Sequence, residues 1–270
     1  MKQLTFFLCL MLLFSCKSNE QPEIVSQVVI EKIIDELNKD EIPRGEKIIA
    51  IVGATLIDGN GGNPLANSLV IIENEKINYV GVVGSTEIPA EAEIVDADGL
   101  TLLPGLIDAH YHNDYNTEMP TLFLSKGVTS VRDPGAWMDY YQPARDTGKD
   151  LPRLFLTGPH LDTYPPAYPD NSYLIKDEME GRLAVNLFAD RGATAIKVYL
   201  GLSIGMIKEI CDAAHERGIP VTGHLETANA KDAILAGMDG VEHVTSFGTV
   251  LIPMREAEKY KKLIANDKNA

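Results

Sequence analysis

Cysteine and positive charge are both scarce in this sequence of 270 residues. Its three cysteines, Cys9, Cys16 and Cys211, are too few and too badly spaced for a disulfide framework, and no C-x-x-C pair offers metal ligands. The 24 lysines and arginines stand against 39 aspartates and glutamates, which gives a formal net charge of −15. Because nucleic-acid binding depends on clustered Lys and Arg, we expect no nucleic-acid partner. The acidity favours solubility.

The apolar run at the N-terminus is too short to span a membrane. It covers residues 4–14, about 11 residues, whereas a helix needs ~20 to cross a bilayer. It follows Lys2 and precedes a polar run, which is typical of an export signal. Leu13 and Ser15, ahead of Cys16, resemble the lipobox of bacterial lipoproteins.

This signal predicts an exported protein of the bacterial cell envelope, in the periplasm or anchored to a membrane. Residues 1–16 are expected to be a lipoprotein signal peptide with Cys16 as the lipidated residue, so the lipid anchor would be the only membrane contact. Ordinary signal cleavage with an incidental cysteine is the alternative. Residues 17–45 read as a polar connector with one helical pattern, and we assign them no chemistry.

Two folding units are expected after the connector. The apolar content of 45% is enough for one large domain with a small companion. Residues 46–104 hold short β segments with a Gly- and Asn-rich turn at 58–62, which predicts a small antiparallel β domain. The predicted segments are 48–51, 54–57, 68–73, 76–83 and 93–96.

Residues 105–270 alternate between apolar strands and amphipathic helices, which is typical of parallel βαβ units. The predicted strands are 106–112, 128–133, 153–157, 195–199, 220–224 and 240–244. The predicted helices are 117–126, 138–147, 176–191, 204–217, 228–236 and 256–266. Most of the helices close with a glycine, as left-handed caps do. Six such units are present, and an eight-stranded barrel would need two more.

Four of the six histidines fall at the carboxyl ends of these strands, where parallel α/β folds keep their sites. His110 and His112 end the first strand. In an extended strand their side chains would point to the same face, where the two imidazoles could bind one metal ion. For an isolated H-x-H pair, core packing and a carbonyl hydrogen bond are the alternative. His224 and His243 lie at the ends of the fifth and sixth strands, so a barrel would bring all four into one ring.

Lys197 lies within the apolar fourth strand, where an ammonium group is costly unless it is paired or modified. An ion pair with Asp133 or Glu242 is one explanation. The other is that a desolvated lysine of lowered pKa reacts with carbon dioxide, since a carbamate can bridge two cations.

These motifs together resemble the metal-dependent amidohydrolase superfamily. The matching stretches, P-G-L-I-D-A-H-Y-H, G-V-T-S-V-R-D-P-G, A-I-K-V-Y, V-T-G-H and G-V-E-H-V-T, are most similar to the branch of imidazolonepropionase and the proline-dipeptide hydrolases. The resemblance implies a (β/α)8 barrel with a small β-sandwich. It also implies one or two divalent metal ions, zinc as first choice, held by His110, His112, His224 and His243, with a carbamate on Lys197 as the bridge.

The implied activity is hydrolysis of a carbon–nitrogen bond in a small amide, cyclic amide or dipeptide by water that the metal activates. His160 and Tyr199 are candidates for substrate contact, with loop or barrel packing as the alternative. The superfamily's catalytic aspartate ends strand eight, and no residue here matches it, so no catalytic residue is assigned. We therefore expect a truncated form of the enzyme. The alternatives are pairing with another polypeptide in an oligomer, or an inactive, lipid-anchored metal-binding or small-molecule-binding barrel.

Overall fold

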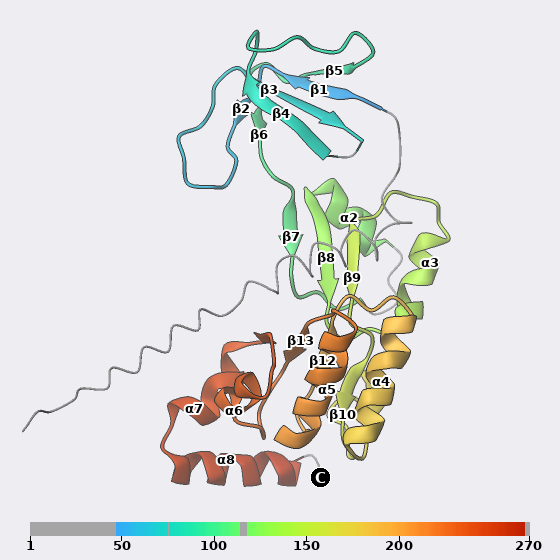
Figure 1. Ribbon diagram of the computed structural model, residues 1–270, viewed down its shortest axis with the longest axis vertical. Helices are drawn as coiled ribbons and strands as arrows, with labels where there is room; N and C mark the ends of the chain where they lie inside the picture. The colour runs from blue at the N-terminus through green and yellow to red at the C-terminus, as the bar shows by residue number, and fades with distance from the viewer. Residues whose placement is uncertain (1–46, 75, 114–117, 268–270) are drawn as a thin grey trace, which may run out of the picture.

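A computed structural model describes residues 47–267, apart from 75 and 114–117 (Figure 1). The predicted signal peptide, the lipidation at Cys16 and most of the connector lie outside the described residues. A small β domain comes first in the described chain and is followed by a larger α/β domain (Figure 1). No helix among the described residues has the length and apolar character needed to cross a membrane.

The small domain consists of two sheets. The larger has the strand order β4-β3-β1-β5, and Ala50, Leu69 and Ile71 form its buried core. β1 is antiparallel to β3 and parallel to β5. The prediction of an antiparallel β domain is therefore wrong for the pairing of β1 with β5. The reason is that the chain crosses over before β5 instead of turning back in a hairpin. The predicted β-sandwich stays a prediction. The strands are β1 (Ile49–Val52), β2 (Thr55–Leu56), β3 (Ser68–Glu73), β4 (Lys76–Val82), β5 (Glu93–Asp96) and β6 (Thr101–Leu102), the short β2 and β6 forming the second sheet.

Every strand pair in the larger domain is parallel, as the alternation of strands and helices predicts. Two sheets are present, with the orders β7-β8-β9 and β11-β10-β12-β13-β14. They are linked where Thr194 N–H donates to Leu156 O at 2.8 Å. The strands are β7 (Leu106–Asp108), β8 (Val128–Asp133), β9 (Arg153–Leu156), β10 (His160–Asp162), β11 (Ser172–Leu174), β12 (Ile196–Val198), β13 (Val221–Gly223) and β14 (Gly240–Val241). Successive strands thus follow one another in space, as in a barrel wall.

Two short strands were not predicted. The predicted third strand bends at Gly158, whose φ of +76° suits glycine, and continues as β10. β11 pairs with β10 on the side away from β12. Both strands are three residues long, too short to produce a periodic pattern in the sequence.

The helices follow the predicted positions, most with shorter ends, although the last one extends past its predicted bounds at both ends. α4 begins where Asp177 accepts from Glu180 N–H at 2.9 Å, and α5 begins where Ser203 accepts from Met206 N–H at 3.2 Å. The predicted helix 138–147 is divided into a 3-10 turn and a short α-helix. The bounds are α2 (Met119–Ser125), η1 (Met138–Tyr141), α3 (Gln142–Arg145), η2 (Pro169–Asn171), α4 (Glu178–Asp190), α5 (Ile204–Glu216), α6 (Ala230–Leu235), η3 (Val244–Phe247), α7 (Gly248–Leu251) and α8 (Met254–Asp267).

The glycines predicted to cap helices adopt left-handed backbone angles. Gly127, Gly192, Gly218 and Gly237 have φ values of +84°, +87°, +71° and +112°. Each of them therefore lets the chain leave a helix sharply and enter the next strand.

The main core lies between the five-stranded sheet and helices α4, α5 and α6. Side chains such as Phe188, Ile196, Ile207 and Val221 are fully or almost fully buried there. α4 and α5 lie side by side over this core (Figure 1). The core anchors β12 and β13, whose carboxyl ends carry candidate site residues.

Among the described residues, two strands that end this strand order have, like the short β11, a partner on one side only. β7 pairs with β8 alone, and β14 pairs with β13 alone. Leu106 and Ile107 on β7 are 61% and 70% exposed, which is unusual for apolar residues on a barrel strand.

Candidate metal centre

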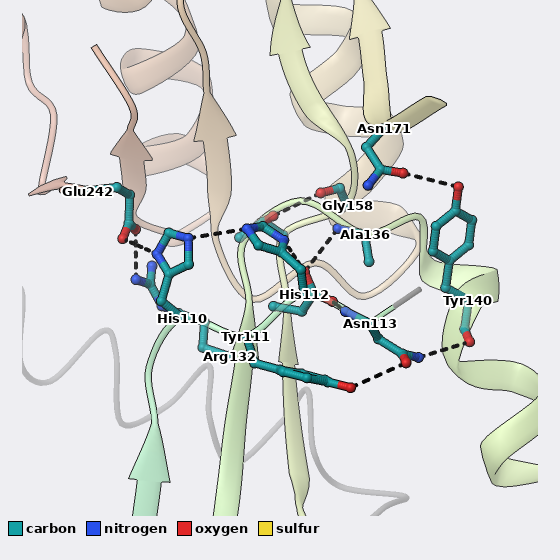
Figure 2. Close-up of polar contacts among 12 residues, drawn as sticks. His110, Tyr111, His112, Asn113, Arg132, Ala136, Tyr140, Gly158, Asn171 and Glu242 are labelled. Atoms are coloured by element: carbon teal, nitrogen blue, oxygen red, sulfur yellow. Dashed lines mark hydrogen bonds and ion pairs between the residues drawn. The ribbon is translucent and has the colours of Figure 1, made fainter. Parts of the chain in front are cut away.

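His110 and His112 lie in the segment that follows β7, because β7 ends at Asp108. The predicted extended strand to residue 112 is therefore too long. The backbone turns there: His110 N–H donates to Asp108 Oδ1 at 3.1 Å, and Tyr111 N–H donates to Arg132 O at 3.0 Å. The two imidazoles still meet, since their Nε2 atoms lie 3.2 Å apart (Figure 2).

Each of these imidazoles contacts a carboxylate through its other nitrogen. His110 Nδ1 lies 2.8 Å from Glu242 Oε2, and His112 Nδ1 lies 3.3 Å from Asp133 Oδ1. Glu242, His110 and His112 form one line of polar contacts (Figure 2). A carboxylate on one nitrogen of a histidine orients the ring and leaves the other nitrogen free for a metal.

His224 and His243 extend this pair into a chain of four imidazoles. The ring of His243 lies 4.5 Å from that of His110 and 4.7 Å from that of His224, centre to centre. His224 is held on the end of β13 by its backbone, whose N–H donates to Val198 O at 3.1 Å. The structure therefore brings together the four histidines that the sequence singles out.

Lys197 is almost fully buried on β12, with 1% of its surface exposed. Burial lowers the pKa of its ammonium group to about 8, against a smaller opposing effect of Glu242. Its charge in turn contributes to lowering the pKa values of His110, His224 and His243, so it lies near all three.

The predicted alternative, an ion pair of Lys197 with Asp133 or Glu242, is not found among the described residues. Both carboxylates have other partners. Asp133 accepts hydrogen bonds from Asn113 N–H, Ala136 N–H and the Tyr141 hydroxyl at 2.9–3.1 Å. Glu242 is occupied by a histidine and an arginine. Lys197 thus keeps a buried amine of lowered pKa without a direct carboxylate partner.

The donor set suits a divalent cation. Burial lowers the pKa values of His110, His224 and His243, so these imidazoles are neutral at pH 7 and have lone pairs to share. No three His, Cys, Asp or Glu side chains in the described part of the chain already converge on one point. The Nε2 atoms of His110 and His112 lie 3.2 Å apart.

His160 and Tyr199 lie beside this cluster. Their rings stack at 4.3 Å with an angle of 12° between planes, and the ring of His112 lies 6.2 Å from that of His160. His160 is buried, and its Nδ1 has no hydrogen-bond partner among the described residues. Burial, with the nearby charge of Lys197, lowers the pKa of His160 to about 3, so this ring stays neutral. The predicted substrate role stays a prediction, but both side chains adjoin the histidines.

Comparison with known proteins gives partial matches. No protein-family model matches the chain. An uncharacterized protein of Mycobacterium tuberculosis is 30% identical over 203 residues, which cover 63% of this chain and 54% of that protein. The N-acyl-D-aspartate deacylase of Alcaligenes xylosoxydans is 34% identical over 100 residues, 36% of this chain and 19% of the deacylase. The imidazolonepropionase of Idiomarina loihiensis is 37% identical over 67 residues, 25% of this chain and 16% of the relative.

A solved structure supports the same relationship. A Bifidobacterium longum protein that carries the name prolidase superposes with a TM-score of 0.63 at 27% identity, over 74% of this chain and 55% of the neighbour. The named relatives and this neighbour are amidohydrolases. The predicted resemblance to the amidohydrolase superfamily, in the branch of imidazolonepropionase and prolidase, is confirmed. The α/β fold with parallel sheets, like that of amidohydrolase barrels, is confirmed too, whereas closure of the barrel is not. The chain spans about half the length of the first relatives it matches.

Sequence reasoning missed how Arg132 takes part in this amidohydrolase-like site. Its Nη2 donates to Glu242 Oε1 at 2.7 Å (Figure 2). Its Nε donates to Ala109 O at 2.7 Å. Burial by itself would raise the pKa of Glu242, but the charges of Lys197 and Arg132 and hydrogen bonds from His110 and Arg132 outweigh burial and lower it to about 2. The sequence did contain a signal for this contact: Arg132 and Glu242 are charged residues of opposite sign near the carboxyl ends of two predicted strands.

Proposed function

We propose that this protein is a metal-dependent hydrolase of carbon–nitrogen bonds in a small amide, cyclic amide or dipeptide. The observation that carries the proposal is the chain of four imidazoles beside the buried Lys197. Nitrogen ligands of this kind favour zinc, although another first-row cation can take its place. The names of the relatives, a deacylase, an imidazolonepropionase and a prolidase, support a substrate that is a small amide or a dipeptide.

The metal-holding residues in this proposal are His110 and His112 for one ion, and His224 and His243 for a second. When bound, a divalent cation lowers the pKa of its water toward ~7 and polarises the substrate carbonyl. Lys197 would bridge the two ions as a carbamate. Its lowered pKa supplies the neutral amine, which forms an N–C bond to carbon dioxide and releases one proton.

The remaining residues of the site orient and enclose the substrate in this proposal. His160 and Tyr199 present a stacked imidazole and phenol beside His112, where an amide carbonyl or a carboxylate could accept a hydrogen bond. Burial raises the pKa of Tyr199, so its hydroxyl keeps its proton and remains a donor. Glu242 and Asp133 hold the imidazoles that face them.

A turnover assay tests the proposed function. The full chain, loaded with Zn²⁺, is incubated with a panel of N-acyl amino acids, cyclic amides and dipeptides. His110→Ala should reduce turnover by more than about 100-fold, because it removes a metal-binding imidazole. His215→Ala is the matched control, since His215 pairs with Asp239 outside the cluster. Unchanged turnover in His110→Ala would make the metal mechanism wrong.

The second candidate is an inactive barrel that binds a metal or a small molecule. Zn²⁺ binding without turnover on the whole panel would favour this candidate, because the metal ligands would then act without a catalytic partner. The proposed export and lipid anchor are tested separately. Mass analysis of the mature N-terminus in cells should find a lipidated Cys16, and an unmodified residue there would remove the lipoprotein assignment.

A further inference from the structure

Glu242, which follows β14, joins two side chains, one after β7 and one on the neighbouring strand β8, at the other end of the strand order. One of its carboxylate oxygens lies 2.8 Å from His110 Nδ1, and the other accepts from Arg132 Nη2 at 2.7 Å. The carboxylate side chain is only 8% exposed. Its backbone is held as well, since Glu242 N–H donates to Gly223 O at 2.8 Å.

Arg132 keeps this carboxylate in one orientation. Its guanidinium also donates to Ala109 O at 2.7 Å and to Thr222 Oγ1 at 3.4 Å. Because guanidinium is planar and rigid, these bonds from two of its nitrogens restrict where the third partner, Glu242, can lie. Glu242 Oε1 therefore accepts the hydrogen bond from Arg132, and Glu242 Oε2 faces His110.

The protonation pattern of His110 follows from this geometry. A carboxylate only accepts hydrogen bonds, so His110 Nδ1 must carry the proton at their contact. His110 Nε2 then has a lone pair, and it faces His112 Nε2 at 3.2 Å. The Nδ1 of His112 also lies near a carboxylate, 3.3 Å from Asp133 Oδ1, which favours the same tautomer there.

We propose that Glu242 is a positioning residue that, clamped by Arg132, keeps His110 in the tautomer protonated on Nδ1, so that two Nε2 lone pairs face one another. Two facing lone pairs repel each other unless a cation lies close to both. The arrangement therefore prepares His110 and His112 to bind a divalent cation before it arrives. This inference deepens the proposed function and rests on it for the identity of the ligand, but the tautomer is a property of the metal-free chain.

The tautomer can be measured directly. The full chain is labelled with ¹⁵N-histidine, freed of metal and studied at about pH 8, above the ordinary histidine pKa of ~6.5. Long-range ¹H–¹⁵N correlation spectra distinguish a protonated Nδ1 from a protonated Nε2, and loss of one signal set in His110→Ala assigns the residue. We expect protonation on Nδ1 of His110. Protonation on Nε2 in the unsubstituted chain would overturn the proposal without any variant having to fold.

Glu242→Gln should reverse the tautomer. Arg132 still requires an acceptor, so the amide oxygen turns to Arg132 and the amide NH₂ turns to His110. His110 Nδ1 must then accept, and the proton moves to Nε2, where it can donate to His112 Nε2. Both lone pairs are lost to the metal, and we expect Zn²⁺ affinity to fall by about 10- to 100-fold.

Asp239→Asn is the matched control for this substitution. Asp239 lies 2.8 Å from His215 Nε2, a carboxylate–imidazole contact outside the cluster, so this variant should alter His215 and leave His110 and Zn²⁺ affinity unchanged. A His110 tautomer unaffected by Glu242→Gln would contradict the positioning role. If the unsubstituted chain binds no Zn²⁺ in competition with a chelating dye, the proposed function fails, while the tautomer result stands on its own.

Discussion

Replacing Lys197 by methionine should stabilise the fold at neutral pH. The pKa of this buried lysine falls from its ordinary 10.5 to about 8, chiefly through desolvation. Each step of one in pKa corresponds to ~1.4 kcal/mol, so a charged Lys197 costs the folded state about 3 kcal/mol. Methionine keeps the length of the side chain and removes the charge. An effect of this size is a large part of the ~5–15 kcal/mol that stabilises a domain.

The pH dependence gives this prediction its sign. Below pH 8 the lysine is protonated in both the folded and the unfolded chain, so the full penalty is present. Between pH 8 and 10.5 the folded chain releases the proton while the unfolded chain keeps it, and the stability of the unsubstituted protein rises. Above pH 10.5 the penalty is gone. Lys197→Met lacks this rise, so its advantage should shrink from about 3 kcal/mol toward zero.

Urea denaturation of both proteins from pH 7 to 10.5 measures the difference. The buffers must be free of metal and carbon dioxide, so that Lys197 remains an amine. Lys208→Met is the control, because Lys208 is exposed and its pKa is raised by a hydrogen bond to Asp212. Equal stability of Lys197→Met and the unsubstituted protein at pH 7, or an advantage that stays constant with pH, would refute the reasoning.

Two further predictions concern buried polar groups. Tyr141→Phe should lower the free energy of unfolding by about 1.5–3 kcal/mol in urea denaturation, because the hydroxyl donates to the fully buried Asp133 at 2.9 Å. The exposed Tyr164→Phe should change it little, and equal effects would be inconsistent with this reading. Burial raises the pKa of Cys211 to about 12, so we expect no alkylation of folded Cys211 by iodoacetamide at pH 8 and rapid alkylation in urea. The same shift means that Cys211 lowers the free energy of unfolding as pH rises from 9 toward 12. Fast labelling of Cys211 itself in the native chain, located by peptide mass analysis, would contradict the prediction.

The fold was predictable where residues carry a strong local signal. β8 has the same bounds in sequence and structure, since a segment rich in β-branched residues between a glycine and a charged end defines it. The glycine caps follow from backbone sterics alone. The parallel pairing of β1 with β5 was not predictable, because it depends on a contact between segments about 40 residues apart. The short strands β10 and β11 owe their existence to their neighbours in the sheet.

The sequence was enough to predict which residues gather at the site, but it was not enough to predict which of them contact one another. The recurrence of histidines at strand ends identified the four imidazoles, which the structure brings together. The roles of Arg132 and Glu242 depend on which of several charged neighbours each one meets in space. The sequence offered Glu242 as a partner of Lys197, whereas in the structure Arg132 and His110 occupy both of its oxygens.

Among the described residues, β7 and β14 each pair on one side only, which has a consequence for how copies of this chain would associate. They are different surfaces, so pairing the β7 edge of one molecule with the β14 edge of another would be a head-to-tail contact. A contact of this kind repeats from molecule to molecule and does not stop at a pair, unlike a two-fold interface. Self-association through these described strands would give open-ended chains, or rings where the rotation between neighbouring copies closes. Light scattering would then show a mass that grows with concentration beyond twice the monomer.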